Sequence, residues 1–518
     1  MKTNLIIMCL CFFMSLSAQK DGIQVAQQDY VIKNLLCDKP DLMGKAYVFP
    51  YRVFNFSVDK ASNLLFVQLR KEKKNGEYYT NKGEMLQYDL MSGNTLWQEK
   101  MSYMFSEVMH EDSLILMSDD KSTRKIDASS GLEAWKTNIR IRNISSGNIG
   151  FGYDEGLSFT GQRSNMLTGI NLTSGETQWK RKVRFDYGWT DMRYPDDSTL
   201  LLVAGDLQCI NLNNGEGWEY KTTTAKKDYK QSIGINALGL AAGLLTGTAL
   251  IYTGNDLLTD LKSNILINDS VIYFASTEAI AKLDRNTGNP VWSYPFEKKE
   301  ASRSSIFLRG DTLYMVNMGA GIMSENIVPY GKSFMAAFNV STGEKLYYSL
   351  FSDEKKDVIN SCMLAGDSVF MIRDNKLCIA SIRSGEIEKE VAFEQDSIGE
   401  LNLFIRGNVF KSAGKESNRM IPLTQSENEV LFIHTTNNYI LGVDKHANIV
   451  RIYRGSELAT LYAKTDKYRI ISFGHDYMLM DNEGEVSTLF TAPYRLKVID
   501  NTLYGIDGNR IFKIDLES

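Results

Sequence analysis

The chain of 518 residues is poor in proline and histidine and has no excess of positive charge. Eight prolines and 39 glycines are too few for a disordered or collagen-like chain. Lysine and arginine number 58 against 63 acidic residues, a formal net charge of −5. Phosphate binding needs clustered cations, and groups such as RKEKK at Arg70–Lys74 are short and mixed with acids. We interpret them as solvated loop and expect no nucleic-acid partner.

Cysteine is also sparse, and its spacing carries no redox or metal motif. Outside the N-terminal apolar run the chain has Cys37, Cys209, Cys362 and Cys378, far apart and without a CxxC pair. A domain this large can bury a sufficient core without disulfides. We therefore interpret the four as buried small hydrophobic residues, with Cys362 and Cys378 as the pair to bridge if any does.

The N-terminus has the pattern of a secretory signal. MKTN places one lysine before the apolar run LIIMCLCFFMSLS, and Ala18–Gln19 follows as a small residue before a cleavage site. Cys9 and Cys11 lie inside the apolar run without a small residue before them, so we expect no lipid anchor. The sequence predicts a signal peptide over 1–18 and an exported protein, periplasmic, extracellular or associated with the outer membrane.

A short motif, Asp/Asn-x-x-Ser/Thr-Gly-x-x-x-Trp, recurs along the chain. Its first occurrences are separated by 38 and 44 residues, measured between glycines, and a period near 40 indicates a repeat array. Four copies are complete: Asp89, Gly93 and Trp97; Asp127, Gly131 and Trp135; Asn171, Gly175 and Trp179; Asp284, Gly288 and Trp292. In the fourth unit along the chain, Trp218 comes one residue early and fits the motif loosely.

Each repeat reads as several short strands. Alternating or apolar runs such as MLQYDL (Met85–Leu90) and DSTLLLVAGD (Asp197–Asp206) are bounded by Asp, Asn, Gly and Ser, as strands and hairpins are. Units of about 40–45 residues with several strands fit propeller blades. We predict an all-β chain, a single β-propeller of four-stranded blades over 46–518.

The motif has a structural interpretation. An Asp or Asn at its start accepts hydrogen bonds from backbone N–H groups two or three residues on, and the glycine supplies the positive φ that the hairpin needs. Four residues later, the tryptophan can pack between adjacent blades and donate its indole N–H to a backbone carbonyl. We therefore expect the motif to build the fold.

At these residues the chain resembles the pyrroloquinoline-quinone (PQQ) repeat family, whose signature is close to A-x-D-x-x-T-G-x-x-x-W. The resemblance covers most of residues 46–518 and implies eight blades, whereas the count of hairpins permits seven to ten. We expect the segment 19–45, or a strand from Asp29–Leu36 or Ala46–Phe56, to complete the last blade, since closure removes an exposed sheet edge.

The resemblance alone does not bring an enzyme. The quinoprotein dehydrogenases of this family use PQQ, calcium and, in many members, adjacent cysteines, which this chain lacks outside the N-terminal run. Its four histidines are scattered, and we interpret each as exposed or hydrogen-bonded. We assign no catalytic residue, metal or cofactor, and keep PQQ with calcium as the alternative. A glycine-rich stretch with Asn317, Gly319 and Gly321 is a weak candidate for a ligand loop.

One segment, 226–258, interrupts the repeat. Gly215 and Gly288 are 73 residues apart, and Gln231–Asn255 between them contains no charged residue. Gly239, Gly243 and Gly247 recur every fourth residue, which favours a closely packed helix. Its length would span a bilayer, but a closed propeller forbids blades on both sides of a membrane. The segment either packs on the propeller itself or docks on a membrane surface or partner.

The leading hypothesis is an exported, non-enzymatic propeller that acts as a protein-interaction or cell-envelope scaffold, with the apolar insertion as its docking element and an envelope protein as its partner. Two alternatives remain open. One is a quinoprotein-like or other small-ligand enzyme with its site on the propeller axis. The other is a carbohydrate- or polymer-binding module, since aromatic propeller faces can stack sugars.

Overall fold

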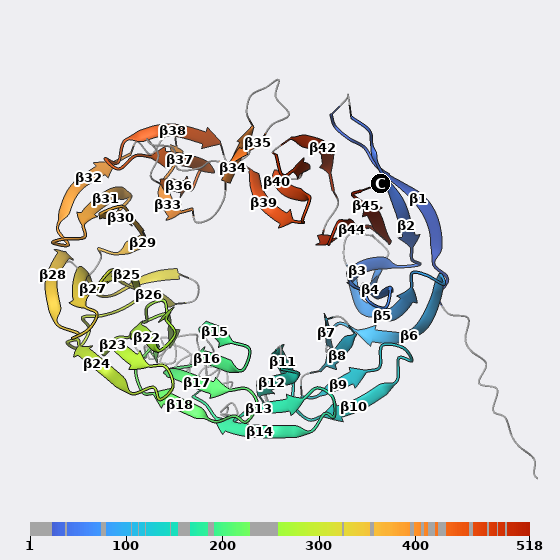
Figure 1. Cartoon of the computed structure of the whole chain (residues 1–518), viewed down its shortest axis with the longest axis horizontal. Coiled ribbons are helices and arrows are strands. Elements are labelled where there is room, and N and C mark those ends of the chain that lie inside the picture. The colour runs from blue at the N-terminus through green and yellow to red at the C-terminus, as the bar shows by residue number, and fades with distance from the viewer. Residues whose placement is uncertain are drawn as a thin grey trace, which may run out of the picture.

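The fold is an array of antiparallel sheets arranged round a ring (Figure 1). The computed structural model describes residues 23–517 except for 37–38, 74–78, 105, 112, 120, 146, 154–165, 185–190, 228–256, 324–325, 353–356, 394–397, 406–408, 413–419, 423–430, 455–458, 474–475, 484 and 493–494. The described residues form eight four-stranded sheets, one six-stranded, one five-stranded and one two-stranded sheet. The all-β propeller prediction is confirmed, whereas the number of eight blades is not.

The four-stranded sheets follow one another in chain order. The first four are β3 (Arg52–Asp59), β4 (Leu64–Glu72), β5 (Tyr79–Asp89) and β6 (Asn94–Ser102); β7 (Glu107–Glu111), β8 (Leu114–Ser118), β9 (Thr123–Ile126) and β10 (Glu133–Thr137); β11 (Ile141–Ile144), β12 (Ile149–Tyr153), β13 (Met166–Asn171) and β14 (Thr177–Lys182); and β15 (Asp191–Asp196), β16 (Thr199–Val203), β17 (Leu207–Asn211) and β18 (Gly217–Tyr220). The next four are β21 (Leu266–Ile267), β22 (Val271–Ala275), β23 (Ala279–Asp284) and β24 (Pro290–Pro295); β25 (Ser304–Arg309), β26 (Thr312–Met323), β27 (Asn326–Asn339) and β28 (Lys345–Ser352); β29 (Ile359–Ala365), β30 (Ser368–Arg373), β31 (Lys376–Ser381) and β32 (Ile387–Ala392); and β33 (Leu401–Phe404), β36 (Leu431–Thr435), β37 (Tyr439–Val443) and β38 (Ile449–Arg454).

The last two large sheets bring the two ends of the chain together. The six-stranded sheet has the order β35 (Met420–Pro422), β34 (Val409–Ser412), β39 (Ala459–Lys464), β40 (Tyr468–Phe473), β41 (Asp476–Asp481) and β42 (Val486–Thr491). The five-stranded sheet has the order β1 (Ala26–Ile32), β2 (Leu42–Val48), β45 (Arg510–Asp515), β44 (Thr502–Asp507) and β43 (Leu496–Ile499). Ala46 of β2 lies opposite Phe512 of β45, so an N-terminal strand closes the last sheet.

The core lies between neighbouring sheets. Middle strands such as β16, TLLLV, are apolar and buried almost throughout because a sheet covers each of their faces. Leu201 of β16 and Phe274 of β22 belong to one buried cluster, and Tyr273 of β22 joins Met315 of β26 in the next. Each sheet is therefore stabilised by burial against the sheets before and after it.

The repeat motif forms the turn between the third and fourth strand of a sheet. In one copy, Asn171 Oδ1 accepts the N–H groups of Thr173 (2.8 Å) and Ser174 (3.1 Å). Gly175, at φ 77°, donates its N–H to the Asn171 carbonyl at 2.8 Å. In the copy at Asp127, hydrogen bonds from neighbouring serine hydroxyls lower the pKa of the carboxyl to about 2. The first residue of the motif thus fixes the turn locally.

The tryptophan of each motif packs on the glycine of the next. Trp179 donates its indole N–H to the Leu212 carbonyl at 2.6 Å, and a Cβ on Gly215 would lie 2.8 Å from the indole ring. The same bond recurs as Trp97–Ala128 (2.7 Å), Trp135–Leu172 (3.1 Å), Trp218–Arg285 (2.8 Å), Trp292–Val340 (2.8 Å) and, through a phenol, Tyr347–Ile382 (2.8 Å). The glycine is required both for its positive φ and for the absence of a side chain.

Trp218 fits this pattern fully, although its spacing suggested a loose fit. In the copy at Asn171, the β13–β14 ladder contains a bulge: Ile170 pairs with Thr177 and Gly169 with Trp179, so one residue is skipped. The β17–β18 ladder has no bulge, and Trp218 lies opposite Cys209. The missing residue is the bulge residue, so its loss leaves the indole in register.

In the motif of the β29–β32 sheet, whose glycine is Gly385, the aromatic residue is lost. Lys389 occupies its position, opposite Ile379, and donates its ammonium to the His446 carbonyl at 2.5 Å. In the following sheets the position holds Arg451 and then Thr488. Packing between these sheets rests on the buried strands more than on an aromatic ring.

The cysteines bear out their interpretation as buried residues where the structure describes them. Cys209, Cys362 and Cys378 are buried and unbridged, and Cys37 lies outside the described residues. The predicted signal peptide and the central part of the insertion also lie outside them.

Replacement of Trp179 tests the contact between sheets. Trp179→Ala removes a buried ring and an indole bond, and we expect it to lower the free energy of unfolding by about 3–5 kcal/mol. Trp179→Phe keeps most of the packing and should cost about 1 kcal/mol for the lost hydrogen bond. Urea denaturation followed by circular dichroism measures both. Met91→Ala, at a side chain 79% exposed, is the control, and equal effects at the two sites would contradict the inter-sheet role.

Candidate functional site at the base of the insertion

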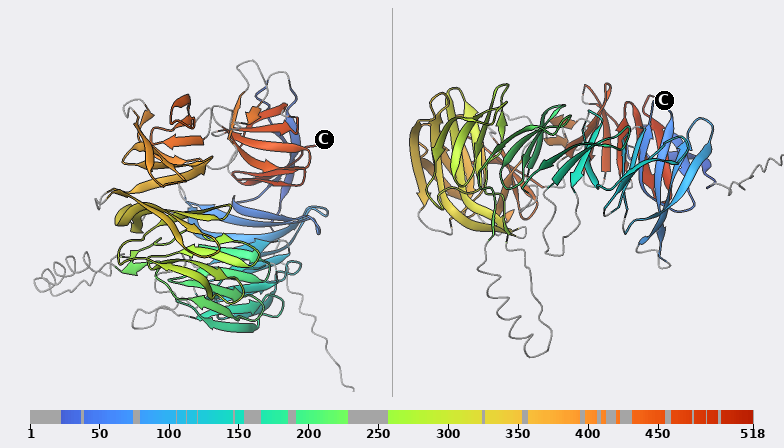
Figure 2. Two further views of the ribbon diagram at one scale, coloured as in Figure 1. Left: turned by 60° about the vertical axis from the view of Figure 1, so that its left-hand side comes forward. Right: turned by 90° about the horizontal axis from the view of Figure 1, so that it is seen from below.

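The two faces of the ring differ. Because consecutive strands of a sheet are antiparallel, every motif turn lies on one face, while the hairpins between second and third strands and the connections between sheets lie on the other. The longest hairpins, β26–β27 with 12 and 14 residues and β4–β5 with 9 and 11, project on this second face. Figure 2 shows β4–β5 extending from one side of the ring. We call this side the connection face.

The insertion leaves and re-enters the fold on the connection face. Its two ends are held together, because β19 (Lys226–Lys227) pairs with β20 (Leu257–Leu258) in an antiparallel ladder. Residues 228–256, with Gly239, Gly243 and Gly247, lie outside the described residues. The described site is therefore the base of the insertion, residues 257–264.

Backbone hydrogen bonds fasten this base to two sheets. Thr259 and Ile322 exchange N–H···O bonds of 2.8 and 3.0 Å, which joins the base to the tip of β26. The Lys262 carbonyl accepts the Ser304 N–H at 3.0 Å, at the start of β25. Leu258 and the following turn pack on β26, since a Cβ on Gly321 would meet the Leu258 side chain at 2.7 Å. The base is therefore attached to the β25–β28 sheet by hydrogen bonds and by packing.

Side chains extend this attachment to the neighbouring sheet. Asn264 uses both ends of its amide on Ile306, accepting its N–H at 2.8 Å and donating to its carbonyl at 3.1 Å. Ser263 donates its backbone N–H to the Ala275 carbonyl, and its hydroxyl accepts the Ala275 N–H, both at 2.9 Å. Two consecutive residues of the base thus contact two different sheets.

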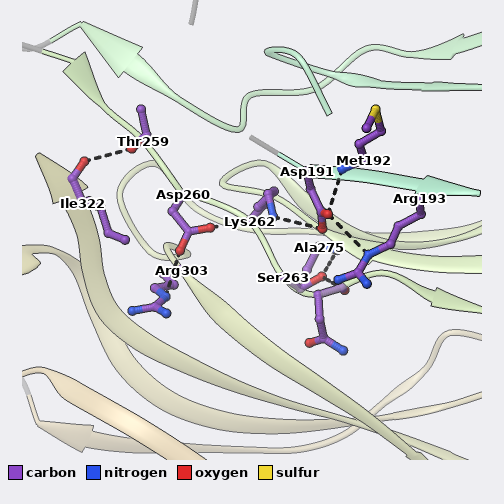
Figure 3. A network of polar contacts seen from close by, with 11 residues as sticks. Asp191, Met192, Arg193, Thr259, Asp260, Lys262, Ser263, Ala275, Arg303 and Ile322 are labelled. Atoms are coloured by element: carbon purple, nitrogen blue, oxygen red, sulfur yellow. Dashed lines mark hydrogen bonds and ion pairs between the residues drawn. The ribbon is translucent and has the colours of Figure 1, made fainter. Parts of the chain in front are cut away.

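A chain of alternating charges lies over these contacts (Figure 3). The Lys262 ammonium is 7% exposed and lies 3.6 Å from Asp191 Oδ2 and 3.7 Å from Asp260 Oδ1. Asp260 Oδ2 accepts from Arg303 Nε at 2.9 Å, and Asp191 Oδ1 lies 3.3 Å from Arg193 Nε. Because a buried ammonium is tolerated only when it is paired, these carboxylates hold the base against β15 and β25.

The structure places Asn317 and Gly319 inside the β26–β27 hairpin. Asn317 is fully buried, accepts the Ser302 N–H at 2.8 Å and donates to the carbonyls of Glu300 (3.3 Å) and Lys332 (2.5 Å). Its amide is thus occupied by backbone groups. Gly319 takes the positive φ, 66°, at the kink of this hairpin. A ligand role for this stretch remains a prediction.

The interpretation of the histidines as exposed or hydrogen-bonded holds at His110 for one of its two ring nitrogens. His110 is stacked on Phe66, with ring centroids 4.6 Å apart, and its Nδ1 contacts the Ser57 hydroxyl. Burial lowers its pKa to about 4, and its buried Nε2 has no partner among the described residues. His434 bonds Asn438 at 3.2 Å, and His475 lies outside the described residues.

Neither a metal site nor a membrane helix occurs in what the structure describes. The described part of the chain contains no group of three or more His, Cys, Asp or Glu side chains placed to hold a metal ion. Within the same residues, no helix has the length and apolar character needed to cross a membrane.

The charged residues of the base were not predicted from the sequence. Asp191 begins β15, Lys262 lies in the base and Arg303 directly precedes β25, and the three share no motif, so only folding brings them together. One signal was present: Asp260 and Lys262 are among the first charged residues after the uncharged run Gln231–Asn255. Such charges mark where an apolar segment returns to the fold.

Comparisons with known proteins place the repeats. Residues 74–294 match the family model described as outer membrane protein assembly factor BamB, which bears the PQQ name. BamB from Moraxella catarrhalis is 12% identical over 74% of this chain and 96% of its own, with a TM-score of 0.30. The dihydro-heme d1 dehydrogenase NirN, solved with DHE, is 10% identical over 73% of each chain, with a TM-score of 0.32. A search of curated protein sequences gives no match. The repeats over residues 74–294, less than half of the chain, are thus similar to the PQQ-like, BamB-type repeat family.

Proposed function

We propose that this protein is an exported, non-enzymatic scaffold of the cell envelope, whose insertion docks on a protein partner or on the membrane surface that carries it. The family match supports a role in assembly, because the matching model is described by an outer membrane protein assembly factor. The predicted signal peptide would export the chain to the cell envelope, the compartment in which an outer membrane assembly factor acts.

The observation that carries the proposal is the way the insertion is mounted. Its strand ends are paired, and the six residues after them contact three sheets through backbone bonds and a buried lysine. A surface loop without a binding role does not need so many contacts at its base, whereas an element that holds a partner at one position does. The sequence Gln231–Asn255, which lies outside the described residues, contains no charged side chain, and the described ends on either side of it are fixed on the ring.

Deletion of the insertion tests the docking role. Replacing Gln231–Asn255 by a short Gly-Ser linker should leave the melting temperature unchanged, because the β19–β20 ladder and the base remain. The protein should then no longer be recovered with envelope membranes or cross-linked to its partner.

The matched control replaces residues 156–163, which connect β12 and β13 on the same face, by the same linker. Recovery of the deletion variant at the level of wild type and of this control would refute the docking role. Binding to protein-free lipid vesicles separates the two docking targets, since only a contact with the membrane surface would persist there.

Substitution of Lys262 tests the mounting of the insertion. Lys262→Met removes the cation that Asp191 and Asp260 share, while Arg193 and Arg303 remain as their partners, and we expect a loss of about 1–3 kcal/mol in the free energy of unfolding. Lys45→Met, which breaks an exposed pair with Asp29 (62% and 77% exposed side chains), should leave the free energy of unfolding nearly unchanged. Chemical denaturation measures the free energy of unfolding of both variants. Equal losses would show that the charged base stabilises the protein no more than an exposed ion pair does.

The proposal also predicts that the chain does not use the cofactor of its enzymatic relatives. Calorimetric titration with PQQ in the presence of calcium should give no heat of binding and no shift in melting temperature. Saturable binding would instead favour the quinoprotein-like alternative.

A further inference from the structure

A second group of side chains on the connection face is built around one arginine. Arg70 was interpreted as solvated loop, but it lies on β4 and is half-buried. Its guanidinium carbon is 4.9 Å from the ring centres of both Phe54 and Tyr103 and 5.3 Å from that of Tyr79. Three rings therefore hold the guanidinium in place through cation–π contacts.

Arg495, from the other end of the chain, faces the same ring. Its guanidinium carbon lies 5.4 Å from the Phe54 centre, and its Nη1 donates to the Phe54 carbonyl at 2.8 Å. Arg495 holds a φ of 64°, which a residue with a side chain adopts at a cost. We call Phe54, Arg70, Tyr79, Tyr103 and Arg495 the arginine–aromatic patch.

The patch carries positive charge without a balancing carboxylate. Among the described residues, no carboxylate lies within 4.0 Å of Arg70 or Arg495, whereas nearby Arg52 pairs with Glu72 at 3.0 Å. Lys497 adds a third cation, whose Nζ donates to the Phe56 carbonyl at 2.6 Å. Burial and the charge of Arg495 lower the pKa of Lys497. The cations thus repel one another and would be stabilised by an anion.

The two arginines also retain unused donors. Arg70 directs Nε and Nη2 to the Thr80 carbonyl, at 3.2 and 3.1 Å, and Nη2 also to Asn81 at 3.4 Å. In the described part of the chain, Arg70 Nη1 and the Nε and Nη2 of Arg495 make no hydrogen bond. A guanidinium held flat against a ring presents its N–H edge to a carboxylate.

We propose that the arginine–aromatic patch binds an acidic polypeptide segment, whose carboxylates pair with Arg70 and Arg495 while its apolar groups pack on the rings. Arginine and tyrosine are the side chains that dominate binding energy at protein interfaces, and the Tyr79 ring is 37% exposed. A free inorganic anion would use the N–H groups but leave the aromatic surface unused. The inference deepens the proposed scaffold role by naming the chemistry of one partner.

The position of the patch agrees with such a role. It is formed by the start of β3, the end of β4, the start of β5, the residue after β6 and the residue before β43, all on the connection face. The insertion base lies on the same face, so one partner could reach both elements, or each could hold a different one.

The test uses a fluorescent decapeptide of alternating Glu and Tyr, and the full-length protein. Fluorescence anisotropy should show saturable binding that weakens steadily with added salt. Arg495→Asn, which suits a positive φ, combined with Arg70→Gln should weaken binding at least about tenfold, since each removes a charge-assisted bond. Lys345→Gln is the matched control, because the Lys345 ammonium also lies over two rings, 5.1 Å from the centre of Tyr294 and 5.5 Å from that of Tyr348. This variant should bind the peptide as the wild type does.

Several outcomes would overturn the inference. These are equal binding by the double variant and wild type, equal binding of a Gln–Tyr peptide, or binding of inorganic phosphate or anionic vesicles in place of the peptide. Arg495→Asn alone, which keeps the Arg70 hairpin intact, guards against misfolding and should weaken binding by itself. The variant lacking Gln231–Asn255 should bind the peptide normally. Failure of the wild-type protein to bind the peptide, with envelope recovery intact, would therefore refute the patch and leave the scaffold role standing.

Discussion

The architecture depends on one contact, an indole ring of one sheet placed on a bare glycine of the next. Trp179 and Gly215 show why it is specific: the glycine must have positive φ, it has no space for a Cβ, and the carbonyl of Leu212, three residues before it, accepts the indole N–H. Glycine therefore meets two requirements at once, the positive φ and the absence of a side chain. Because the sheets from β7–β10 to β21–β24 both give and receive this contact, the repeat sets the spacing of these sheets along the ring.

This contact also separates regular from irregular parts of the molecule. The motif turns occupy one face and are uniform, whereas the insertion base, the long hairpins and the arginine–aromatic patch occupy the other. The series of aromatic contacts between sheets ends at Lys389. The sheets that follow are stabilised by their buried strands and by the pairing of β2 with β45. Features that the repeat does not need for stability are free to serve binding, and they gather on the connection face.

The motif could be predicted from the sequence because its interactions are local or strictly periodic. Trp218 was misjudged because counting residues cannot reveal a bulge, whose loss keeps the register. The number of sheets was not predictable, since late repeats lack the tryptophan. Lys262 with Asp191, and Arg70 with Arg495, come from distant parts of the chain and carry no motif. Such sites follow from ring closure and sheet order, which local patterns do not encode.

The central claim is that the face with the motif turns stabilises the ring, while the connection face binds partners. Hydrogen–deuterium exchange of the protein, alone and bound to envelope membranes or to its cross-linked partner, tests this most directly. The account predicts slower exchange on binding at residues 257–264 and in the β4–β5 hairpin, with unchanged exchange at the motif turns Asp89–Gly93, Asp127–Gly131 and Asn171–Gly175. Protection confined to those motif turns would contradict it.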